Sequence, residues 1–135
     1  MVAVVSSRMP AILGLGLDLV EISRVSLALE RWGARLVEKL MDPDEAAALP
    51  ATGPERALAV ARAVAAKEAA SKAIGTGWSR GVRWRDVVLD TRAEPRVTLR
   101  GRAAEVASRL GSKGGSQLRF ERHGDLLLAE LRLLA

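Results

Sequence analysis

A carboxylate, a hydroxyl and an ammonium share one face of an alanine-rich segment in the middle of the chain. Residues 65–77 read Ala-Ala-Lys-Glu-Ala-Ala-Ser-Lys-Ala-Ile-Gly-Thr-Gly, and the spacing of Glu68, Ser71 and Lys72 makes them neighbours on a helix. The group is typical of phosphate or metal binding, because the rest of this face is apolar. A Glu and a Lys four residues apart also form a common stabilising ion pair, so the segment alone leaves both interpretations open.

A second acidic residue lies at the end of an apolar segment near the start of the chain. Residues 12–24 alternate apolar residues with Gly14, Gly16 and Asp18, which is the pattern of a buried strand that another backbone or a ligand can approach closely. One interpretation is a core strand with an acidic end. The other is a magnesium site formed by Asp18 and Glu68, because Mg²⁺ usually takes one or two protein carboxylates beside water and substrate phosphates.

The elements that must position these residues alternate between strands and helices, which predicts an α+β fold. Asp42 should cap a short helix that has Pro43 in its first turn and Glu45 as the capping glutamate. Gly33 is a weak point in the first long helix. The expected elements are a strand at 12–18, helices at 23–41 and 55–74, strands at 84–90 and 96–100, a helix at 102–110, a glycine-rich loop at 111–116, and a hairpin of strands at 117–122 and 126–133.

Composition indicates one compact domain. The 135 residues are 49% apolar and 27% charged, and we expect a loose extension over residues 1–11 before a single domain at 12–135. The absence of cysteine excludes disulfides and thiolate metal sites, and the apolar runs are too short to span a membrane. The net charge of +5 favours an acidic partner. Scattered arginines, no tyrosine and one phenylalanine argue against nucleic acid as that partner.

In this order and spacing, the two segments resemble the holo-[acyl-carrier-protein] synthases, the short-chain group of 4′-phosphopantetheinyl transferases. The resemblance covers residues 12 to about 110, and residues 65–77 match the second family signature at every fixed position. The first signature, Gly-x-Gly-x-Asp-x-Val-Glu-Ile-x-Arg, is matched by Gly14, Gly16, Asp18, Val20, Glu21, Ile22 and Arg24. Later family positions are matched by Trp84, Asp86, Val87, Val88, Leu99, Gly101, Ala103 and Ala107.

The resemblance implies a long alanine-rich helix packed on a mainly antiparallel sheet, and a cytoplasmic homotrimer that serves fatty acid biosynthesis. The implied reaction is Mg²⁺-dependent transfer of 4′-phosphopantetheine from coenzyme A to a serine of an acidic apo acyl carrier protein. The implied metal ligands are Asp18 and Glu68, with Glu68 and Lys72 as catalytic residues and Arg24 as a contact of the carrier protein. The implied contacts of coenzyme A are Lys72, Gly75, Thr76, Gly77, Arg122 and His123.

The sequence departs from the family pattern at three places. Ala63 and Val64 stand where an arginine and an aromatic residue are usual, and residues 93–95 replace a Gly-Lys-Pro turn. Residues 119–122 replace the family's Ser-x-Ser-His element, and the only histidine, His123, follows one position later. A shift of one residue turns a side chain to the opposite face of a strand unless a bulge or turn restores it.

Two alternatives to catalysis follow from these departures. In one, the domain binds coenzyme A or a carrier protein, or serves another acyl-thioester system, without this transfer. In the other, it is a subunit-interaction module in which Glu68 and Lys72 form only a structural pair. Retention of both Asp18 and Glu68 argues against the second alternative.

Overall fold

The computed structural model describes residues 10–135, so most of the extension expected over residues 1–11 lies outside the described residues. In chain order the elements are β1 (Ile12–Glu21), α1 (Ile22–Trp32), α2 (Ala34–Leu40), α3 (Pro43–Ala47), α4 (Gly53–Ala73), a 3-10 helix η1 (Trp84–Asp86), β2 (Val87–Asp90), β3 (Arg96–Leu99), α5 (Gly101–Arg109), β4 (Ser116–His123) and β5 (Leu126–Leu134). One antiparallel sheet has the order β1-β5-β4, and β2 pairs with β3 in a second antiparallel sheet. The predicted α+β class is confirmed.

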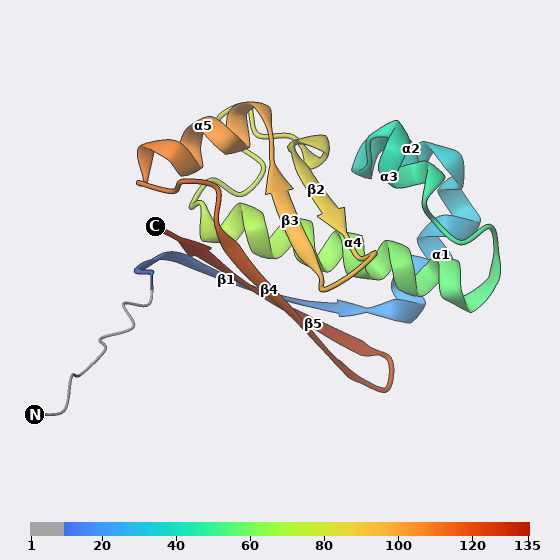
Figure 1. The fold of residues 1–135 in the computed structure, drawn as a ribbon. Coiled ribbons are helices and arrows are strands. Elements are labelled where there is room, and N and C mark those ends of the chain that lie inside the picture. Colours follow the sequence, from blue (N-terminus) through green and yellow to red (C-terminus); the bar gives the residue numbers. More distant parts are fainter. Residues whose placement is uncertain (1–9) are drawn as a thin grey trace, which may run out of the picture.

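The long helix α4 is the centre of the fold. It lies across the β1-β5-β4 sheet, with β2 and β3 on its other side and α1 to α3 grouped near its beginning (Figure 1). Half of its residues are buried, and alanine supplies most of them, so the helix is covered on several sides and not along a single stripe. Within the described residues, no helix is both long and apolar enough to cross a membrane.

Two glycines bring the backbones of β1 and α4 into direct contact. A Cβ atom added to Gly14 would lie 1.9 Å from the carbonyl oxygen of Ala73, and one added to Gly16 would lie 1.7 Å from that of Ala69. No side chain fits in these gaps, which confirms that the glycines of this strand permit the close approach of another backbone. Since side chains alternate along a strand, Asp18 points to the same face as Gly16, towards α4.

The first helical region is two helices and not the single helix expected over 23–41. α1 ends at Trp32 and α2 begins at Ala34, because Gly33 between them has a φ of 51° and donates its amide to the Leu29 carbonyl. Such a φ suits glycine and ends an α-helix. The weak point predicted at Gly33 is therefore a complete break.

The predicted short helix α3 is confirmed with its cap. Asp42 accepts a hydrogen bond from the Glu45 amide at 2.8 Å, and Glu45 accepts one in return from the Asp42 amide at 3.3 Å. By contrast, the strand expected over 84–90 begins only at Val87. Residues 84–86 form the 3-10 turn η1, because the Asp86 carboxylate accepts a hydrogen bond from the Arg83 amide at 2.9 Å.

A buried lysine ties α4 to the elements around it. Lys67 has no exposed surface, and its ammonium lies 3.0 Å from the Glu45 carboxylate and donates to the carbonyls of Trp84 and Val87. Burial lowers the pKa of Lys67, while the adjacent Glu45 opposes the shift. Glu45 also accepts the Leu89 amide at 3.1 Å. One buried ion pair therefore joins α3, α4, η1 and β2.

The C-terminal hairpin is confirmed, and its register fixes where the last predicted site residues point. β4 and β5 pair without a bulge from Ser116 to His123, and the turn consists of Gly124 and Asp125. Because side chains alternate across this regular pairing, Arg122 points to the α4 face and His123 to the outer face of the sheet.

Candidate active site

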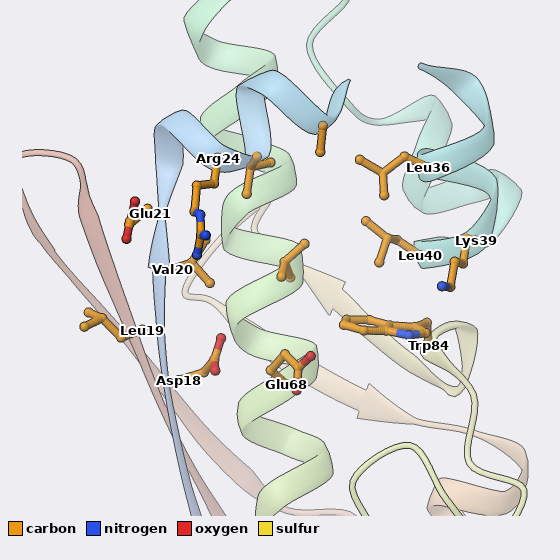
Figure 2. A pocket seen from close by; sticks show the side chains of 13 residues that line it. Asp18, Leu19, Val20, Glu21, Arg24, Leu36, Lys39, Leu40, Glu68 and Trp84 are labelled. Atoms are coloured by element: carbon orange, nitrogen blue, oxygen red, sulfur yellow. The ribbon is translucent and has the colours of Figure 1, made fainter. Parts of the chain in front are cut away.

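Asp18 and Glu68 line the same cavity. It has a volume of about 440 Å³ and lies between β1, α1, α2, α4 and η1. Figure 2 shows Asp18 on β1 and Glu68 on α4, with the Arg24 guanidinium extending from α1 towards this end of the cavity. Gly16 lies two residues before Asp18 on β1, and Ala69 directly follows Glu68 on α4. The backbone contact between Gly16 and Ala69 therefore sets the separation of the two carboxylates.

Lys72 pairs with Asp18 and not with Glu68. Its ammonium lies 3.1 Å from the Asp18 carboxylate and donates a hydrogen bond of 2.9 Å to the Leu17 carbonyl. The Lys72 side chain is 51% exposed, so the ammonium is accessible from solvent while it touches the site. The ion pair within the helix that the spacing of Glu68 and Lys72 suggested is therefore wrong, because the Lys72 side chain extends to Asp18 on β1.

Glu68 has no hydrogen-bond or ion-pair partner for its side chain among residues 10–135. A partly buried carboxylate without a partner is costly, since its charge is neither paired nor fully solvated. No group of three or more acidic or histidine side chains suited to a metal is present in the described part of the chain. Two carboxylates that line one cavity are a donor set that fits Mg²⁺, which usually keeps several ligands from water and phosphate.

The rest of the cavity wall is largely apolar. It includes Val25, Leu36, Leu40 and Val64, and it is closed by Trp84, which stacks on Trp78 with ring centroids 4.0 Å apart. The family resemblance did not assign Trp84 a role at the site, although the residue was matched as a family position. Val64, at the position where the family pattern led us to expect an aromatic residue, lines this wall.

The backbone amides after α4 are used by the helix itself. The Gly75 amide donates to the Lys72 backbone carbonyl, and the amides of Thr76 and Gly77 both donate to the Ser71 carbonyl. Gly75 has a φ of 82°, which is the conformation of a glycine that ends a helix. The helix-cap explanation considered for this turn is therefore confirmed, and in this conformation any contact with a nucleotide through these residues would have to use other atoms.

Arg122 lies outside the first cavity. It lines a second cavity of about 880 Å³, together with Ser23, Arg56 and Asp125, between α1, the start of α4 and the hairpin turn. His123 lines neither of these two cavities. Its ring Nε2 lies 2.9 Å from the Glu121 carboxylate on the exposed surface. Within one chain, the structure therefore brings together Asp18, Glu68, Lys72 and Arg24, and it does not bring Arg122 or His123 to them.

Comparison with known proteins finds relatives of this chain. The sequence profile described as the 4′-phosphopantetheinyl transferase superfamily matches residues 14–129. The chain is 43% identical to a holo-[acyl-carrier-protein] synthase of Alkalilimnicola ehrlichii over 105 residues, which are 76% of this chain and 82% of that protein. It is 46% identical to the protein of that name from Halorhodospira halophila over 102 residues, which are 74% and 80% of the two chains.

Solved structures of the same kind share the fold. The holo-[acyl-carrier-protein] synthase of Neisseria meningitidis superimposes with a TM-score of 0.79 at 26% identity, over 93% of this chain and all of that one. The protein of that name from Bacillus anthracis, in complex with coenzyme A (3′,5′-ADP), gives a TM-score of 0.70 at 26% identity, over 92% and 97% of the two chains.

Proposed function

The chain belongs to the holo-[acyl-carrier-protein] synthases of the 4′-phosphopantetheinyl transferase superfamily, and from this we infer that it transfers the 4′-phosphopantetheine group of coenzyme A to a serine of an apo acyl carrier protein. The observation that carries the inference is the meeting of the two signature segments in one cavity, which Asp18 and Glu68 both line, with the Lys72 ammonium paired to Asp18. The serine oxygen forms a bond to the phosphorus nearest the pantetheine arm. The bond from that phosphorus to the bridging oxygen breaks, adenosine 3′,5′-bisphosphate leaves with the electron pair of that bond, and the serine proton passes to solvent water.

We propose that the reaction depends on Mg²⁺ held by Asp18 and Glu68. The support is the chemistry of the donor set, since both side chains present hard oxygens to one cavity and Glu68 has no other partner among the described residues. When bound, Mg²⁺ would neutralise charge on the phosphate oxygens.

Lys72 is proposed to contact a phosphate of coenzyme A. Its ammonium already donates to the Asp18 carboxylate and the Leu17 carbonyl at the edge of the cavity, and its third proton can be donated to a phosphate oxygen. Preorganised positive charge of this kind stabilises the charge that develops on a phosphoryl group during transfer. A role for Lys72 in relieving the serine of its proton is the alternative assignment.

Helix α1 is proposed to receive the carrier protein. Its exposed face carries Arg24, Leu27 and Arg31, three residues at helical spacing that combine positive charge with an apolar contact. Arg24 also lines the cavity of Asp18 and Glu68, so a partner on this face lies beside the carboxylates. The net charge of +5 favours an acidic carrier protein over a neutral one.

A homotrimer is proposed as the working assembly, in the cytoplasm and in lipid metabolism. The support is the outer face of the β1-β5-β4 sheet, where Leu15, Leu17 and Leu19 are 56%, 47% and 60% exposed. A row of exposed leucines of this kind marks a protein interface. A ring of three copies would also allow the Arg122 cavity of one copy to face the Asp18 cavity of the next. Sedimentation of the wild type and of Leu17→Glu tests this proposal, which a monomeric wild type would overturn.

The transfer itself is tested by incubating the purified chain with apo acyl carrier protein, coenzyme A and Mg²⁺ and following the carrier's mass. We expect the mass to rise by one phosphopantetheine group, and Glu68→Gln to abolish the rise. A reaction without Mg²⁺ and with a chelator separates transfer from its metal requirement. An unchanged mass with wild-type protein, across several bacterial carriers, would favour binding without transfer.

A further inference from the structure

Helix α1 begins without a cap of its own. The residue before it, Glu21, makes no side-chain hydrogen bond to the helix, and its first turn contains no acidic residue. The first amides of a helix have no partner within the helix, and a helix start that lacks a side-chain acceptor is less stable. Residues outside α1 must therefore accept hydrogen bonds from its first amides.

Asp125, in the turn of the C-terminal hairpin, supplies the missing acceptors. Its carboxylate accepts the Ser23 amide at 2.9 Å and the Ser23 hydroxyl at 2.5 Å, and its backbone carbonyl accepts the Ile22 amide at 2.8 Å. A negative charge at this end also interacts favourably with the dipole of the helix. One residue, 102 positions away from Ser23, therefore satisfies the start of α1.

The turn that carries Asp125 is itself fixed. Arg122 donates from its Nε to the Gly124 carbonyl at 3.0 Å, and Gly124 has a φ of 57° that suits the tight turn. The turn closes a regular ladder between β4 and β5, and β5 in turn pairs with β1. Asp125 is thus connected through the sheet to the strand that carries Asp18.

The rest of α1 is held more weakly than its beginning. Only Ile22 and Val25 are buried in this helix of eleven residues, both within its first turn, and the helix ends at the break of Gly33. Arg24 directly follows Ser23, so the anchored residue and the cavity-lining arginine are neighbours in the chain. Movement of the first turn would therefore move the docking face relative to Asp18.

We propose that Asp125 is a positioning residue for the acceptor protein: it fixes helix α1, and with it Arg24, relative to the carboxylates, so that a docked carrier presents its serine to the phosphate. This inference rests on the proposed function. It assigns Asp125 no contact with the carrier's serine, and its effect should fall on recognition of the carrier and not on binding of the metal.

The test compares four variants in steady-state transfer with a bacterial apo acyl carrier protein at saturating coenzyme A. Asp125→Ala should raise the KM for the carrier about tenfold, as expected for the loss of a strong cap, and change kcat less than about twofold. Asp125→Asn keeps an oxygen acceptor and should fall between the wild type and Asp125→Ala. Ser23→Ala keeps both backbone hydrogen bonds and should raise KM about threefold. Asp44→Ala removes an exposed carboxylate at the start of α3 and serves as the control for charge.

Hydrogen exchange and metal affinity separate positioning from a general loss of structure. In Asp125→Ala, the amides of the first turn of α1 should exchange faster while those of α4 are unchanged, and Mn²⁺ affinity should equal that of the wild type. An unchanged KM in Asp125→Ala despite faster exchange would overturn the proposal. If Asp125→Ala does not fold, an unchanged KM in both Ser23→Ala and Asp125→Asn would do so. A wild type that transfers nothing would remove the proposed function and this inference with it.

Discussion

Replacing Gly16 with alanine should separate the two halves of the active site. The new Cβ would lie 1.7 Å from the Ala69 carbonyl oxygen and 2.7 Å from its carbon, whereas ordinary contact begins at 3.4 Å. Both atoms belong to the backbone of α4 and cannot rotate away. The helix and the strand must therefore move apart by about 1.7 Å, unless the whole contact is remodelled.

This displacement acts directly on Asp18 and Glu68, because the contact lies beside both residues. A misplacement of about 1 Å can cost a hundredfold in rate, so we expect kcat/KM to fall at least about 100-fold. Overpacking of this kind costs about 1–3 kcal/mol or more, so the melting temperature should fall by about 5–10 °C. Mass-shift kinetics, Mn²⁺ binding and thermal unfolding measure the three effects.

Gly115→Ala is the matched control, because a Cβ at Gly115 meets only the Leu134 Cβ at 3.6 Å, which is ordinary contact. It should keep wild-type activity and stability within experimental error. A Gly16→Ala variant with wild-type transfer rate and Mn²⁺ affinity would refute the reasoning, since it would show that the site does not depend on the backbone contact.

The remaining predictions concern single side chains. Asp18→Asn and Glu68→Gln should each weaken Mn²⁺ binding at least about tenfold while leaving the fold intact, which circular dichroism checks, and unchanged binding in both would contradict the metal assignment. Arg24→Glu should raise the KM for the carrier, and raising the salt concentration should raise the wild-type KM, because these charges are exposed and screened. Arg122→Ala should weaken coenzyme A binding in calorimetry if Arg122 completes the nucleotide site, and equal affinity in both proteins would exclude it from that site. The hydrogen bond from Glu45 and the charge of Arg100 lower the pKa of Asp42. Its carboxylate therefore stabilises the fold above its unfolded pKa of about 4, and this contribution is lost as the pH falls below that value. Thermal unfolding at pH 7 and at about pH 2 should show a smaller loss of stability on acidification in Asp42→Asn than in the wild type.

The sequence predicted the elements that carry the site because their signals are local. Glycines at alternate positions of an apolar strand predict that another backbone or a ligand approaches this strand closely, and the family resemblance implies that the alanine-rich helix packs on the sheet. The capping residues Asp42 and Glu45 likewise mark the start of α3 by their own chemistry.

What the sequence did not predict depends on contacts between distant residues. Lys72 at helical spacing from Glu68 predicts a pair within the helix, but the tertiary fold brings Asp18 closer to the ammonium. No residue close to Ser23 in the sequence indicates that Asp125 caps α1, since the acceptor comes from the other end of the chain. The start of β2 was predicted three residues early, because the Asp86 side chain holds a 3-10 turn where β propensity alone favours a strand.

The stacked indoles at the wall of the cavity give the protein an intrinsic optical probe. The chain has three tryptophans and no tyrosine, so its near-ultraviolet emission comes almost entirely from these residues. Trp84 lines the cavity and stacks on Trp78, whereas Trp32 lies half exposed at the end of α1 under the Arg31 guanidinium. A molecule that enters the cavity changes the surroundings of the stacked pair, and a molecule that docks on α1 changes those of Trp32. Both events can therefore be followed by tryptophan emission without a label. The Trp32→Phe variant reports occupancy of the cavity, and the Trp84→Phe variant reports docking on α1.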